Sequence, residues 1–168
     1  DGKSALFRQW PFEMGGEGQS LVTRSFVSNA WGMVSMPSSD VALPADSSLR
    51  LFRWREEFGR YVDIRDTLAS GRLLRGMGYW LLSDGPLTLH VDDSNRLAEV
   101  ADTFTLTVVK GWNMITSPYA FAVKLPAAAT DTLHTWAGDR YVTSDVLEPW
   151  KSYFYYSTDG VSLVFTGQ

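Results

Sequence analysis

A set of short motifs occurs twice in this chain, in the same order and about 80 residues apart. The phrase "NAWGMVSMP" (29–37) returns as "KGWNMITSP" (110–118), with its Trp, Met and Pro at a constant offset of 81 residues. Three further motifs follow in both copies: Leu-x-x-Trp (51–54 and 133–136), Arg-Tyr-Val (60–62 and 140–142), and an aromatic strand with a turn and a second strand (78–91 and 152–165). Such a repeat predicts two similar structural units. We place them at residues 1–93, which include an additional N-terminal strand, and at residues 94–168, and call them the front half and the back half.

Both copies have the pattern of short β-strands. "TFTLTVV" (103–109) alternates and is rich in β-branched residues, which is typical of a half-buried strand. "SYFYYS" (152–157) is aromatic on both faces, which is typical of a central strand covered on each side. No long segment has apolar residues at the helical spacing. The sequence therefore predicts an all-β fold with about six short strands per copy, sandwich or open-barrel like, and with the two copies packed on each other.

Turn residues predict where the strands reverse. In the back half, Lys110-Gly111, "AGD" (137–139) and "TDG" (158–160) each separate two expected strands and include a glycine that can adopt a positive φ. We therefore expect the chain to fold back on itself as an antiparallel pair at each of these turns.

Composition excludes several classes of function. The net charge of −4 divides evenly, with −2 in residues 1–93 (10 basic, 12 acidic) and −2 in residues 94–168 (5 basic, 7 acidic). A nucleic-acid surface needs a basic stripe, and the arginines at positions 50–60 are interrupted by two glutamates. The chain has no Cys for disulfides or thiolate metal sites, and no apolar run long enough for membrane insertion. Because it opens without a leader or an initiator Met, we expect a processed chain or a piece of a longer one.

Four phrases together resemble a known type of module. They are W-x-M-V-S-x-P from Trp31, L-F-R-W from Leu51, G-x-G-Y-W-L from Gly76, and G-W-N-M-I-x-x-P-x-x-F-x-V from Gly111. Their order resembles a β-repeat module that occurs in tandem in large secreted or surface-anchored bacterial proteins, over about residues 20–167. Ser117 departs from that pattern, because the module usually has Asn before the proline. The resemblance implies an extracellular structural or binding role, with no catalysis assigned to the module.

Signals for catalysis and metal binding are weak. His90 and His134 lie on expected strands, and "HVDD" (90–93) is the one local group of possible metal ligands. There is no G-x-S-x-G motif for a nucleophile. Paired carboxylates for glycoside hydrolysis stay open, since strands distant in sequence can bring any two together. We predict no catalytic residue, no cofactor and no metal ion.

Five of the seven tryptophans, together with Tyr119 and Phe121, fall into two groups. Trp31, Trp54, Trp112 and Trp136 recur at equivalent positions on strands, which predicts core residues in each copy. Tyr119, Phe121 and Trp150 instead fall in loops, where exposing a large aromatic side chain is unfavourable unless something covers it. We predict a contact surface at these three residues. The alternative is that they pack against the neighbouring copy.

These observations predict a non-catalytic, extracellular structural or adhesive β-module of a bacterial cell-surface or secreted protein. Its expected partners are other modules of a longer parent protein, or a surface glycan or protein. A carbohydrate-binding module accessory to a secreted hydrolase is the main alternative, because such modules present Trp and Tyr as flat platforms. A small hydrolase and a subunit that polymerises through its edge strands are two further alternatives.

Overall fold

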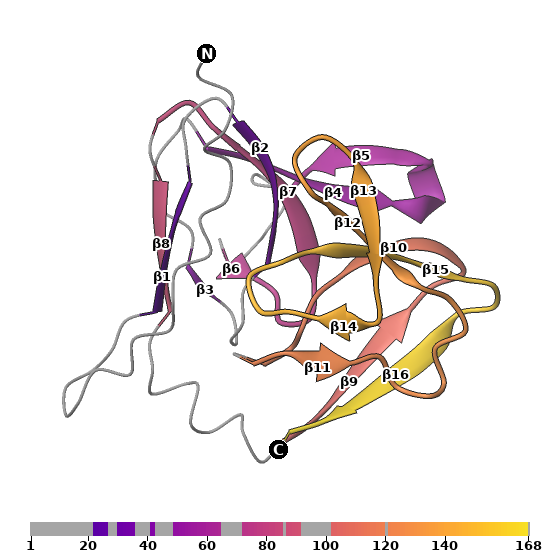
Figure 1. Cartoon of the computed structure of the whole chain (residues 1–168). Coiled ribbons are helices and arrows are strands. Elements are labelled where there is room, and N and C mark those ends of the chain that lie inside the picture. Colours follow the sequence, from indigo (N-terminus) through magenta and orange to yellow (C-terminus); the bar gives the residue numbers. More distant parts are fainter. Residues whose placement is uncertain are drawn as a thin grey trace, which may run out of the picture.

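The structure is a computed structural model that describes residues 22–26, 30–35, 41–42, 49–64, 72–85, 87–91, 102–119 and 121–167 (Figure 1). Nearly all regular structure in these residues is β-strand, and the helical part described is the short 3₁₀ turn η1 (Glu56–Phe58). The predicted all-β fold is therefore confirmed. Among the described residues each half contributes eight strands, which is two more than the sequence pattern predicts.

The front half contains β1 (Val22–Phe26), β2 (Ala30–Ser35), β3 (Val41–Ala42), β4 (Leu49–Arg55), β5 (Arg60–Asp63), β6 (Arg72–Leu73), β7 (Gly78–Ser83) and β8 (Leu87–Val91). The back half contains β9 (Thr103–Val108), β10 (Gly111–Ile115), β11 (Val123–Lys124), β12 (Leu133–Trp136), β13 (Tyr141–Ser144), β14 (Val146–Leu147), β15 (Tyr153–Ser157) and β16 (Val161–Thr166). The unpredicted strands of the back half, β11 and β14, have only two residues each, too few to show a periodic pattern.

The two halves have the same strand order. The front half pairs its strands as a four-stranded sheet β2-β7-β4-β5 and two ribbons, β3-β6 and β1-β8. The back half pairs its strands as β10-β15-β12-β13, β11-β14 and β9-β16, so that adding eight to each front-half number gives the back-half pairing. All of these pairings are antiparallel.

The register of the paired strands is also the same in both halves. Met33 lies opposite Trp80 as Met114 lies opposite Phe154, and Trp54 lies opposite Tyr61 as Trp136 lies opposite Tyr141. The register of the ribbons agrees too, since the backbone of Phe26 pairs with that of Leu87, and the backbone of Val108 pairs with that of Val161. A slip of one residue would turn every side chain to the other face, so this agreement fixes which faces correspond.

A buried tyrosine holds the turn before the central strand of each sheet. The Tyr79 hydroxyl accepts a hydrogen bond from the Leu74 N–H at 3.0 Å, and the Tyr153 hydroxyl accepts one from the Glu148 N–H at 3.1 Å. Both pairs are separated by five residues and occupy corresponding positions. Burial raises the pKa of Tyr153 to about 12, because the surrounding core disfavours the phenolate.

Two of the three turns predicted for the back half join strands that do not pair with each other. β12 and β13 do form the expected hairpin around residues 137–139. At Lys110-Gly111, however, the chain passes from β9, which pairs with β16, to β10, which pairs with β15. The "TDG" turn likewise connects β15 to β16 across two sheets. Gly111 (φ 96°) and Gly160 (φ 76°) adopt the left-handed conformation at these corners.

Each half has its own hydrophobic core on one face of its four-stranded sheet. The front core contains Val34, Leu49, Leu51, Ile64, Leu73, Tyr79 and Leu81. The back core contains Leu106, Val108, Ile115, Tyr119, Leu133, Leu147, Tyr153, Tyr155, Leu163 and Phe165. The opposite faces of the two sheets pack on each other, so the central strands β7 and β15 are covered on both sides, as the sequence predicts. Across this packing, β10 of the back half contacts β4 and β7 of the front half, and β12 contacts β2.

Candidate binding surface

Six side chains, which we call the seam, join the two halves. Met33, Met114 and Phe154 are buried there, and Trp54, Trp80 and Trp136 pack partly buried against them. They form three pairs of corresponding positions, which are Met33 with Met114, Trp54 with Trp136, and Trp80 with Phe154. Contacts cross between the halves, since the Trp80 and Trp136 ring centroids lie 6.3 Å apart and the Trp54 N–H lies 3.4 Å from the Met114 Sδ. Such a contact between like surfaces has approximate two-fold symmetry, as in an isologous dimer.

Corresponding residues touch directly at the end of the seam. The Ser35 and Thr116 hydroxyl oxygens lie 2.6 Å apart, and the Lys151 carbonyl oxygen lies 3.0 Å from the first and 2.7 Å from the second. Beside them, a side chain at Gly78 would collide with the Ser152 hydroxyl, its counterpart in the back half. These two pairs place the approximate two-fold axis between Ser35 and Thr116.

The seam covers only the middle of each sheet face, and aromatic side chains farther out are exposed. Trp31 is 48% exposed and Trp112 is 39% exposed, so the prediction that these two residues belong to the core is wrong. Trp54 and Trp136 are partly buried in the seam, between the halves instead of inside either core. Strand alternation places Trp31 and Trp112 on the same faces as Met33 and Met114, but two residues beyond the area that the opposite sheet covers.

Trp31 is held by neighbouring rings and lies beside a pair of charged groups. Its ring is 5.4 Å from that of Phe52 and 6.3 Å from that of Trp80, at interplanar angles of 51° and 84°. The Arg50 guanidinium lies 4.9 Å from the Phe52 ring centroid and forms a 3.3 Å ion pair with Asp63. This group, which we call the Trp31 site, is therefore an exposed indole next to hydrogen-bond donors and acceptors whose charges cancel.

The corresponding place in the back half, the Trp112 site, has the same indole with different neighbours. The Trp112 ring contacts His134, Phe154 and Tyr156 at 5.9, 6.2 and 5.2 Å, in edge-on orientations. His134 stands where the front half has Phe52, and Tyr156 stands where it has Leu82. His134 Nε2 also lies 3.5 Å from the Thr132 hydroxyl, so this site carries an imidazole and a hydroxyl in place of an ion pair.

Glu56 connects the two halves close to the Trp112 site. Its Oε2 accepts hydrogen bonds from the Trp54 indole N–H at 2.7 Å and from the Trp112 backbone N–H at 3.1 Å. The carboxylate lies against Gly111, where any larger residue would collide with it. Glu56 thus locks the start of β10 onto the front half, a role that sequence reasoning did not assign to it.

The three residues predicted to form a contact surface lie elsewhere. Tyr119 is fully buried in the back core, so the structure corrects that prediction, and its hydroxyl lies 2.7 Å from the Asp102 carbonyl oxygen. Phe121 stacks on Tyr119 at 4.9 Å and is half-buried. Trp150 is half-buried and packs against the front core, which is the alternative that the sequence left open. The Ser117 hydroxyl holds this loop by donating to the Phe121 carbonyl at 2.8 Å and accepting from the Tyr119 N–H at 3.1 Å.

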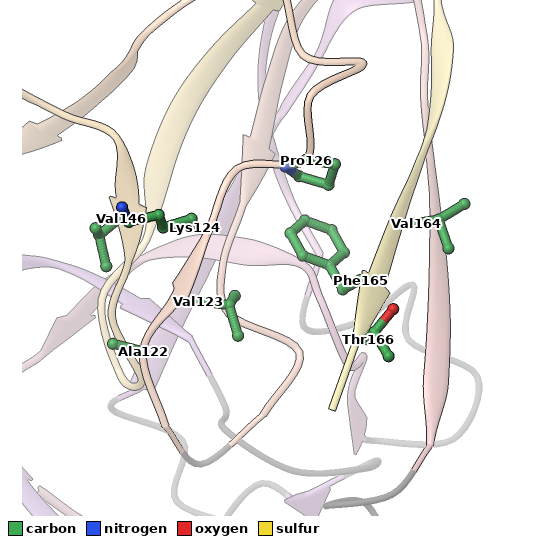
Figure 2. A pocket seen from close by; sticks show the side chains of 8 residues that line it. All are labelled: Ala122, Val123, Lys124, Pro126, Val146, Val164, Phe165 and Thr166. Carbon is green, nitrogen blue, oxygen red and sulfur yellow. The ribbon is translucent and has the colours of Figure 1, made fainter. Parts of the chain in front are cut away.

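A groove of about 470 Å³ lies in the back half, between β11, β14 and β16. It is lined by Ala122, Val123, Lys124, Pro126, Val146, Val164, Phe165 and Thr166, with the Phe165 ring next to Pro126 (Figure 2). Of these lining residues only Lys124 is charged, so the groove offers apolar shape with little polar chemistry.

Within the described residues, no three His, Cys, Asp or Glu side chains come together as a metal site. The "HVDD" segment lies outside the side chains that the structure describes, and His90 with it. No helix in the described part of the chain has the length and apolar character needed to cross a membrane.

Comparisons with known proteins yield no relative: the chain matches no family model, no curated protein and no solved structure. The resemblance to the tandem bacterial module therefore stays a prediction.

Proposed function

We propose that this chain is a non-catalytic structural and adhesive module of a bacterial cell-surface or secreted protein, formed by duplication of one β-unit. The observation that carries the proposal is the seam, because it joins two units of the same strand order through corresponding residues. A unit of this size buries a modest core alone, and packing two units together adds a third apolar cluster.

The seam suits a mechanical role. Aromatic and methionine side chains interlock across it, and the buried contact between Ser35, Thr116 and Lys151 adds directional hydrogen bonds. Two units held in this way resist separation and keep their outer faces at a fixed relative orientation. Other modules of a parent protein, or a surface glycan or protein, are the partners that such a body would hold in place.

Calorimetry of the intact chain tests this structural role. If the halves form one body, thermal unfolding gives one transition whose calorimetric enthalpy equals its van't Hoff enthalpy. Two separate transitions, or a calorimetric enthalpy well above the van't Hoff value, would show that the seam does not couple the halves.

A carbohydrate-binding module accessory to a secreted hydrolase is the second candidate. The exposed indoles of Trp31 and Trp112 favour it, since aromatic faces at a surface suit sugar rings. The two candidates share a binding surface and differ in the parent protein. A catalytic hydrolase domain encoded next to this segment would favour the second candidate, and further β-repeats would favour the first.

A further inference from the structure

We propose that the Trp31 site and the Trp112 site are two binding sites for an uncharged saccharide, one on each half. This inference rests on the proposed adhesive function and names the ligand that the adhesive surface binds.

Both indoles are presented in a fixed orientation. Each is held by at least two neighbouring aromatic or imidazole rings, and none of the described ring contacts to them is a parallel stack. Because tilted and edge-on neighbours restrain a ring without lying flat on it, the indole keeps a face for a ligand. A restrained aromatic platform binds with little loss of conformational entropy.

Polar groups lie on the same sheet face as each indole. Trp31 and Arg50 both lie opposite Leu82, on either side of β7, which puts them in one row across the sheet. Asp63 lies opposite Phe52 in the next row, and its side chain and that of Arg50 are 36% and 58% exposed. The front site therefore places an indole beside a hydrogen-bond donor and a hydrogen-bond acceptor.

The back site has an imidazole beside its indole in place of the ion pair. His134 lies opposite Phe154 on one side and Thr143 on the other, and the Trp112 ring contacts both His134 and Phe154. The preserved feature in both halves is the exposed tryptophan, while its neighbours differ. An exposed aromatic side chain at corresponding places in both halves suits a ligand contact.

The charge of the two sites selects the class of ligand. Arg50 and Asp63 neutralise each other at the front site. At the back site the rings are those of Trp112, His134, Phe154 and Tyr156, and the nearby Glu56 carboxylate is bound by the Trp54 indole N–H and the Trp112 backbone N–H, so neither site carries an excess of positive charge. A nucleic acid or an acidic polysaccharide would need an excess of positive charge. An uncharged sugar ring offers C–H groups to the indole face and hydroxyls to the donors and acceptors beside it, which fits both sites.

Two sites on one rigid body also predict bivalent binding. A polysaccharide that reaches both sites gains affinity through effective concentration, whereas a short oligosaccharide occupies each site independently.

Isothermal titration and affinity electrophoresis of the full chain test the inference, with neutral β-glucan, mannan and galactan as probes and polygalacturonate as the charged comparison. Trp31→Ala and Trp112→Ala each remove one site, so the stoichiometry for a short oligosaccharide of the binding polysaccharide falls from two to one per chain. Affinity for the polymer falls about tenfold in each single variant and is lost in the double variant. Phe58→Ala removes a 60% exposed aromatic residue outside these sites and leaves binding unchanged.

The outcomes separate this inference from the structural role. Binding that survives the double substitution in a folded variant would overturn the assignment of the sites, and preference for polygalacturonate would overturn the ligand class. If the folded chain binds none of the neutral probes, the saccharide inference is wrong, while a single coupled unfolding transition would still support the structural role.

Discussion

The two halves share strand order and register but differ in the residues that fasten them together. Glu56 follows Trp54 by two residues and reaches across to the Trp112 backbone. Gly138 follows Trp136 by the same spacing and has no side chain with which to make the reciprocal contact. The apolar part of the contact between the halves is therefore symmetric, whereas the Glu56 contact is made from the front half alone.

This difference shows that the apolar contacts and the Glu56 hydrogen bonds depend on the sequence in different ways. Cross-strand pairs such as Met33 with Trp80 and Met114 with Phe154 need only apolar side chains of suitable size. The methionine is the same in both halves, while its partner is Trp in one and Phe in the other. The hydrogen bonds that Glu56 accepts need a carboxylate at this one position. We expect changes to the apolar seam to cost far more stability than changes to this single clamp.

A charge placed in the seam has the largest expected effect. Met114→Asp buries a carboxylate where the side chain is 1% exposed, and the free energy of unfolding should fall by about 4 kcal/mol. Met33→Asp should cost a similar amount, because Met33 occupies the corresponding position. Urea titration measures both, with Val164→Asp at a 50% exposed position as a control that stays near wild type. A large effect at only one methionine would show that the halves do not use the seam equally.

Gly78 and Ser152 test the close approach at the two-fold axis. Gly78→Ser should destabilise the chain by about 3 kcal/mol, since the new side chain collides with the Ser152 hydroxyl and lies 3.2 Å from the Ile115 carbonyl oxygen. The exchange variant Gly78→Ser with Ser152→Gly should recover most of that loss, because it moves one side chain to the other side of the axis. Gly85→Ser, at an open position, is the matched control. If the exchange recovers nothing, the two positions are not related by symmetry.

Tyr153 makes the back half sensitive to alkaline pH. The folded chain raises the Tyr153 pKa from 10.0 to about 12, so folding holds this proton more tightly than the unfolded chain does. The stabilisation is complete below about pH 10 and declines by up to about 2 kcal/mol as the pH rises toward about 12. Chemical denaturation at about pH 9, 10 and 11, on both sides of the tyrosine pKa of the unfolded chain, should show this decline in wild type. A Tyr153→Phe variant should show a shallower one, and equal slopes would contradict the role of Tyr153.

The Glu56 clamp has the smallest expected effect. Glu56→Ala removes the acceptor for the Trp54 indole and the Trp112 N–H and should cost about 1 kcal/mol. Glu57→Ala provides the control, because Glu57 is exposed and pairs with its near neighbour Arg55. Indole N–H chemical shifts from NMR should move at Trp54 in the first variant only. An unchanged Trp54 signal in Glu56→Ala would mean that the clamp does not form in solution.

Sequence reasoning succeeded where the determining pattern was local. Alternation and turn residues gave the all-β fold, most of the longer strands and the β12-β13 hairpin, and a strand with aromatics on both faces was recognised as central. It failed at Lys110-Gly111, where the Asn113 side chain satisfies the backbone of the turn by accepting from the Val109 N–H at 3.0 Å and donating to its carbonyl at 2.8 Å. With the turn held in this way, β9 is free to pair with β16 in another sheet.

The candidate site was harder to predict because the exposure of its residues depends on tertiary packing. Alternation shows that Trp31 and Met33 share a face, but the extent to which the opposite sheet covers that face is set by tertiary packing. Tyr119 was placed in a loop correctly, and its burial follows from contacts with Phe121 and with Arg75, whose guanidinium lies 5.1 Å from the Tyr119 ring centroid. Neither contact leaves a local signal in the sequence.

Disulfide formation across the two-fold axis tests the packing of the halves most directly. The chain has no Cys, so a Ser35→Cys, Thr116→Cys double variant contains only the two thiols of interest. Because the native hydroxyls lie 2.6 Å apart, mild oxidation should give an intramolecular disulfide in nearly every molecule, seen as a mass loss of two hydrogens and no titratable thiol in denaturant. Two free thiols per folded chain after the same oxidation would contradict the contact between corresponding residues, and with it the account of the seam.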